Sequence, residues 1–124
     1  MEKSIVELLR AANREDMVSA PAKMEVKRLS AVFGQPFVMT LKPIRYTVWA
    51  KIISDEKTDY RLALIAAAWA EGEEMTGEIL DKFGASDAPG LLANILQGGE
   101  VAKLAAKVEA ISGFGNSVAE IKKK

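Results

Sequence analysis

One segment, residues 60–70, is apolar almost all the way round a helix. Between Leu62 and Ala70 there is no charged residue, and Arg61 is the only charge in the segment. Asp59 is a good N-cap, alanine and leucine are strong helix formers, and Gly72 is expected to end the helix in a left-handed conformation. A helix that is apolar on all sides has to be buried, and this one is too short for a bilayer, which needs about 20 residues. We therefore expect it to be the core helix of a soluble domain.

The N-terminal region predicts a short amphipathic helix followed by a tether. Ser4 and Glu7 have the spacing of a capping box, and apolar residues at helical spacing follow them as far as about Asn13. We expect this helix to pack on the rest of the domain. In residues 14–23 the helical spacing of apolar residues ends, and Pro21 is typical of a loop.

Two alternating segments, residues 24–27 and 37–42, predict β-strands. The residues between them allow a single helical turn closed by Gly34 and Pro36, so a hairpin with a wide loop is expected. A lone hairpin is marginal in water, so its apolar face must lie on a helix or pair with another chain. That face consists of Phe37, Met39 and Leu41.

The C-terminal part carries further apolar stripes at helical spacing. Besides residues 60–70, helices are expected at residues 43–54, 76–83, 87–97, 100–112 and, as a last short segment, 117–124. The expected stops are Gly84, the pair Gly98–Gly99, and Gly113. The pattern predicts a mainly α fold with a small N-terminal β-hairpin (α+β), a compact single-domain helical bundle. Within this domain, residues 1–23 are the helix and loop, 24–42 the hairpin, and 43–124 the bundle.

Composition narrows the possible functions. The 124 residues include 17 basic and 17 acidic side chains, so no net charge draws the chain to nucleic acid or to an anionic membrane, and we expect neither partner. The absence of cysteine and histidine removes disulfides, thiolate nucleophiles and the commonest general base. The N-terminus has no signal-peptide pattern, so we expect a cytoplasmic protein.

No residue cluster predicts a catalytic, cofactor or metal site. An acidic group lacks the spacing of a calcium loop and is interpreted as a solvated face: Glu71, Glu73, Glu74, Glu78 and Asp81. Gly113-Phe114-Gly115 follows a helix instead of opening one, so a helix stop with Phe114 in the core is favoured over a phosphate loop. Trp49 and Trp69 are interpreted as core residues. We expect no enzyme.

Several short motifs follow one another in an unusual order. They are Ile5-x-x-Leu8-Leu9, Glu25–Ser30, Gly34–Phe37, Lys82–Ala85, Leu96–Val101 with Leu104, and Ile111–Gly115. None is diagnostic by itself. In this succession, over nearly the whole length, the chain resembles the XkdN-like phage tail assembly chaperones of PBSX-type prophages.

The resemblance implies a product of a phage or prophage tail operon that assists assembly without joining the finished tail, in the cytoplasm of the bacterial host. Its client would be the tape measure protein, a long, helix-rich chain that sets tail length. Such chaperones are commonly made in two lengths by programmed frameshifting, and the codons of Lys122–Lys124 are a candidate slippery site.

If the chain is a tail assembly chaperone, we expect the partner to contact the hairpin edge and the segment from Glu100 to Phe114. The candidate partner-binding residues are Phe37, Met39, Leu41, Leu104, Val108, Ile111 and Phe114. Self-association into a dimer or ring is a further expectation. The main alternative is a tail structural or connector protein retained in the particle, and a third is a regulatory binding domain unrelated to phage.

Overall fold

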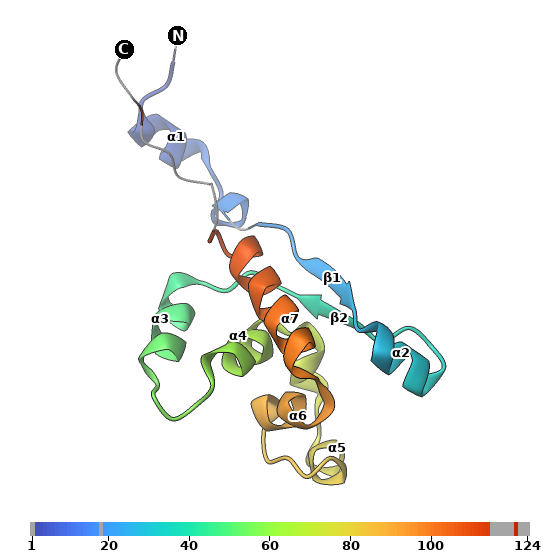
Figure 1. Cartoon of the computed structure of the whole chain (residues 1–124). Coiled ribbons are helices and arrows are strands. Elements are labelled where there is room, and N and C mark those ends of the chain that lie inside the picture. The colour runs from blue at the N-terminus through green and yellow to red at the C-terminus, as the bar shows by residue number, and fades with distance from the viewer. Residues whose placement is uncertain (1, 18, 115–120, 122–124) are drawn as a thin grey trace.

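The structure, a computed structural model, describes residues 2–17, 19–114 and 121. Within these ranges it contains seven α-helices, two 3-10 helices and two strands (Figure 1). In chain order they are α1 (Ile5–Ala11), η1 (Arg14–Met17), β1 (Ala22–Glu25), α2 (Lys27–Phe33), β2 (Val38–Leu41), α3 (Tyr46–Ser54), α4 (Tyr60–Ala68), η2 (Ala70–Glu74), α5 (Gly77–Lys82), α6 (Ala88–Ile95) and α7 (Gly98–Ile111). The predicted fold class, mainly helical with a small hairpin near the N-terminus, is confirmed.

The core forms around α4, as the sequence predicts. Leu64, Ile65 and Ala68 of this helix are buried, and α4 packs against α7, α6 and α3. Asp59 caps it, because one carboxylate oxygen accepts a hydrogen bond from the Arg61 N–H at 2.9 Å. One apolar cluster joins this helix to both strands and to α2, α6 and α7.

The predicted stop of the core helix at Gly72 is wrong. The helix already ends at Ala68, and Trp69 is extended, with φ −74° and ψ 108°. In this conformation Trp69 forms an antiparallel bridge with Leu41 of β2, so pairing with the hairpin ends the helix before the glycine is reached. The glycines that do take positive φ in the described ranges are Gly34, Gly84 and Gly113.

The predicted hairpin is present as an antiparallel pair, in which Ala22 lies opposite Leu41 and Glu25 opposite Val38. Because side chains alternate between the two faces of a strand, Met39 and Leu41 are buried while Val38 is exposed. The connection holds α2, seven residues long rather than a single turn, and Gly34 ends it at φ 69°.

The expectation that the first helix packs on the rest of the domain is wrong. The Ser4–Glu7 capping box is present, but α1 ends at Ala11 and has no buried residue. In Figure 1 it projects away from the helices around α4. The capping box fixes where the helix starts, while its apolar side chains remain in solvent within the described chain.

The expected break at Gly98–Gly99 is also misplaced. The break falls at Leu96, which is extended, and α7 starts at Gly98 with Gln97 as N-cap. The Gln97 N–H donates to Glu100 Oε1 at 2.8 Å, which completes a capping box and accommodates both glycines in the first turn. The last predicted segment, residues 117–124, lies outside the described residues apart from Ile121.

Candidate partner-binding surfaces

The predicted partner-binding residues divide between the core and the surface. Buried side chains are Met39, Leu41, Leu104 and Val108, all in the central apolar cluster. A partner therefore cannot reach these four while the domain keeps this conformation. Partner binding stays a prediction for the half-buried Phe37 and Ile111 and for Phe114, which is 46% exposed.

The structure does not bring these three accessible residues together. Phe37 precedes β2 and lies beside α2, where its ring stacks on Phe33. Ile111 and Phe114 lie at the end of α7, beside the chain that follows β2, because the Ile44 N–H donates to Ser112 Oγ at 3.0 Å. Two separate surfaces result.

The first surface lies at the tip of the hairpin and is formed by Val32, Phe33 and Phe37. Val32 is 66% exposed and Phe33 53% exposed, and the rings of Phe33 and Phe37 are stacked with centroids 5.7 Å apart. We call these three residues the hairpin-tip surface. Sequence reasoning missed Val32 and Phe33, although their spacing from the buried Leu29 marks one apolar helix face that is longer than the core can cover.

Polar contacts hold α2 against the domain. Arg28 donates to both carboxylate oxygens of Glu100, at 3.1 and 2.9 Å, and also to the Ile95 carbonyl at 2.6 Å. The hydrogen bonds from Arg28, and then that from the Gln97 N–H, lower the pKa of Glu100. The side-chain hydrogen bond to Glu100 raises the pKa of Arg28. The helix is thus fixed to the start of α7.

A second set of contacts fixes the hairpin loop to α2. Ser30 Oγ donates to Glu25 Oε2 at 2.7 Å and accepts from the Phe37 N–H at 2.8 Å. Together with the Arg28–Glu100 pair, these bonds set the orientation of the hairpin-tip surface.

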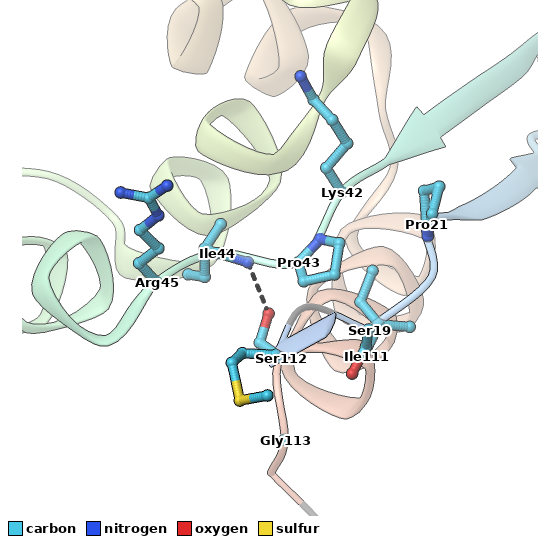
Figure 2. Close-up of a pocket in the computed structure, with 10 residues that line it drawn as sticks. Ser19, Pro21, Lys42, Pro43, Ile44, Arg45, Ile111, Ser112 and Gly113 are labelled. Atoms are coloured by element: carbon cyan, nitrogen blue, oxygen red, sulfur yellow. Dashed lines mark hydrogen bonds between the residues drawn. The ribbon is translucent and has the colours of Figure 1, made fainter. Parts of the chain in front are cut away.

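The second surface surrounds a groove of about 580 Å³ at the C-terminal end of α7 (Figure 2). Its lining includes Met17, Pro21, Pro43, Ile44, Ile111 and Ser112. In Figure 2 the charged ends of Lys42 and Arg45 point away from Ile111 and Ser112. The groove therefore has an apolar interior with cations at its rim.

An aromatic cluster extends this surface. Trp49 contacts Tyr46 on one side and Phe114 on the other, with ring centroids 6.0 and 5.1 Å apart. Trp49 is half-buried against the core, whereas Trp69 is buried, as predicted. The expectation that Phe114 lies in the core is wrong, because Gly113 turns the chain with φ 98° and places the ring at the surface beside Trp49.

The acidic group is solvated except for one member. Glu71 is half-buried, and Glu71 Oε1 accepts a hydrogen bond from the Thr40 N–H at 2.8 Å. Burial raises the pKa of Glu71, but the hydrogen bonds that its carboxylate accepts, first of all from Thr40, together outweigh burial, and the pKa lies below its ordinary value. Glu73, Glu74, Glu78 and Asp81 are exposed, as predicted.

The described ranges contain neither a metal-binding cluster nor a membrane-spanning helix. No group of three or more acidic side chains there is arranged to hold a metal ion. No helix there is long and apolar enough to cross a membrane.

The structure defines a small, mainly helical domain with exposed apolar surfaces. A family model described as "Phage XkdN-like tail assembly chaperone protein, TAC" matches residues 6–123. The chain belongs to this family of phage tail assembly chaperones, as the order of its motifs predicts. No curated protein and no solved structure matches it.

Proposed function

We propose that this chaperone binds the tape measure protein during tail assembly, in the cytoplasm of the bacterial host. A long, helix-rich client exposes apolar stripes until tube subunits cover it, and such stripes aggregate. A chaperone must cover them reversibly with apolar surface of its own. We further propose that copies of the chain associate with one another, as a dimer or ring, while they coat the client.

The observation that carries this proposal is the exposure of Val32 and Phe33 on a helix that Arg28 and Ser30 hold in place. Large apolar side chains kept in water, on a helix that packing and hydrogen bonds already orient, are typical of a helix-binding surface. The stacked Phe37 adds the aromatic area that dominates such interfaces. The hairpin-tip surface is therefore the proposed client site.

Co-expression with the tape measure protein tests the proposal. The measured quantity is the fraction of the tape measure protein that stays soluble and copurifies with the chaperone. We expect the wild-type chain to raise this fraction and the double variant Val32→Ser/Phe33→Ser to abolish the gain, because serine removes most of the exposed apolar area.

Ile53→Ser is the matched control. Ile53 is also exposed, but it lies on α3 and away from α2, so this variant should keep the tape measure protein soluble. A tape measure protein that is equally soluble with and without the wild-type chain would refute the chaperone proposal. Equal protection by the wild type and by the hairpin-tip variant would refute only the location of the site.

The alternative, a structural or connector protein, makes a different prediction about mature particles. A chaperone leaves before the tail is complete, so mass spectrometry of purified particles should find the tape measure protein and the tube subunits without this chain. Its presence at a fixed stoichiometry would favour the structural role.

We also propose that the coding sequence directs a frameshifted longer product with an additional client-binding domain. The proposal rests on Lys122–Lys124, which lie outside the described residues, since consecutive lysine codons can form an A-rich slippery site. Inspection of the coding DNA decides it. The absence of a slippery heptamer and of an overlapping downstream frame would remove this proposal without affecting client binding.

A further inference from the structure

The first helix carries an apolar face that nothing in the described chain covers. Ile5, Leu8 and Leu9 lie on one side of α1, and Ile5 is 74% exposed and Leu9 64% exposed. Glu7 and Arg10 lie on the opposite side. Isolated helices shorter than about 12 residues are marginal in water, so a seven-residue helix with this pattern needs a surface to pack on.

The groove beside Ile44 and Ile111 lies next to the segment that follows α1, since Met17 and Pro21 line it. Its volume of about 580 Å³ lies within the range of sites that enclose compact apolar groups. Its interior is apolar, and the cations at its rim point outward. Aliphatic side chains from one turn of a helix match this hollow in size and in polarity.

The connection to α1 argues against a helix that fills its own groove. Met17 and Pro21, which line the groove, belong to the segment that follows α1. Only Ala12 and Asn13 separate α1 from η1, and α1 projects outward from this point (Figure 1). To turn back into its own groove, the chain would have to reverse within two residues or unwind η1. A groove on a second copy imposes no such reversal.

The area available indicates how many such contacts a stable complex needs. Each buried aliphatic side chain removes roughly 100 Å² from water, so one α1 contributes roughly 300 to 400 Å². A stable interface buries about 800 Å² on each partner. One helix in one groove falls short of this area. A reciprocal exchange, in which each copy supplies one helix and one groove, doubles the contact that a single helix makes.

We propose that two copies of this chain form a two-fold dimer in which α1 of each copy occupies the groove of the other. The arrangement is isologous and therefore closed, so it stops at two copies. It deepens the self-association proposed above and names its interface. It also leaves both hairpin-tip surfaces uncovered, so a dimer would offer two client sites.

Analytical ultracentrifugation of the full chain over a wide range of concentration tests the interface. We expect the wild type to be dimeric and Leu8→Ser/Leu9→Ser to weaken the dimer by at least about 100-fold, since four leucines leave the two contacts. These side chains are exposed within one chain, so the variant should fold like the wild type, as circular dichroism would show. Val32→Ser/Phe33→Ser removes exposed apolar area elsewhere and should leave the dimer intact.

Disulfide trapping identifies the occupant of the groove, because the chain has no cysteine of its own. When the Leu8→Cys and Met17→Cys variants are mixed and oxidised, a disulfide-linked heterodimer should form. Each variant oxidised by itself should give much less covalent dimer. A chain with both substitutions should give linked dimers. Closure within single chains would place α1 in its own groove and overturn the proposal.

The remaining outcomes separate the interface from self-association itself. A wild type that is monomeric at every concentration would refute both. A dimer that survives Leu8→Ser/Leu9→Ser would refute the α1 interface but not self-association. A dimer that is lost only when residues 115–124 are removed would do the same. If the α1 variant stays dimeric but no longer protects the tape measure protein, α1 belongs to the client contact and the exchange is refuted.

Discussion

Leu41 and Trp69 form an antiparallel backbone bridge that joins the hairpin to the end of the core helix. Beside it, the Lys42 N–H donates to the Ala68 carbonyl at 2.8 Å. The Thr40 N–H donates to Glu71 just beyond Trp69. Through these contacts β2 packs on the core even though its only strand partner in the described chain is β1, which explains how so small a sheet is stable.

The central position of α4 makes a quantitative prediction. Ile65→Ala should lower the free energy of unfolding by about 2–5 kcal/mol, because Ile65 is completely buried and its loss leaves a cavity. Ile53→Ala makes the same change on the surface of α3 and should alter stability by no more than about 0.5 kcal/mol. Urea unfolding followed by circular dichroism measures both, and equal losses would mean that α4 is not the core helix.

The cap of the core helix can be tested with two substitutions at one position. Asp59→Ala removes the acceptor of the Arg61 N–H and should cost about 1 kcal/mol of unfolding free energy. Asp59→Asn keeps an acceptor oxygen at the same place and should stay close to the wild type. If urea midpoints show that both variants lose the same stability, the charge and not the cap is responsible.

Acid should destabilise the protein partly through Glu71. Its pKa is lower in the folded chain than its ordinary 4.5, so its contribution is complete above about pH 4.5 and is lost as the pH falls through the lowered folded value. Glu71→Gln should therefore reduce stability at neutral pH and flatten the loss between neutral pH and acid. Melting temperatures across this range measure the effect.

The control for this experiment is Glu74→Gln. Glu74 is exposed in the same 3-10 helix, and no hydrogen bond of its carboxylate is found in the described chain. This variant should retain the acid dependence of the wild type. If its profile flattened as much as that of Glu71→Gln, the general charge of η2 would be the cause instead of the bond to Thr40.

Replacing glycine by alanine should have opposite effects on stability at Gly34 and Gly99. Gly34 ends α2 at φ 69°, a conformation that costs alanine about 1–2 kcal/mol, although no other atom lies within 4 Å of the added Cβ. Gly99 lies in the first turn of α7 with the same free space, so alanine there should stabilise by about 0.4–1 kcal/mol. Thermal unfolding distinguishes the two signs, and destabilisation by both would mean that α7 does not begin at Gly98.

Local sequence signals predicted the elements well where a short motif decides the structure. Ser4 and Asp59 cap helices, and Gly34, Gly84 and Gly113 all take the left-handed conformation at helix ends. These features depend on a few neighbouring residues, so the sequence contains all the information needed.

The same signals failed where distant residues compete with them. Gly72 does not end the core helix, because Leu41, 28 positions before Trp69, pairs with the chain first. Phe114 is not in the core, because Gly113 turns the chain and the ring contacts Trp49, 65 positions earlier, at the surface. For the candidate sites the consequence was larger, since four of the seven predicted partner-binding residues are core residues.

The sequence by itself determined the hairpin, most of the helices and their caps, the apolar helix at the centre, and the family to which the chain belongs. Only the tertiary structure decided which apolar faces remain in water. Periodicity places Leu8, Phe33 and Leu64 alike on apolar helix faces, yet of these three only Leu64 is buried. An apolar pattern states that a face favours burial, whereas the limited area of the core decides which faces the chain itself can cover and which are left for partners.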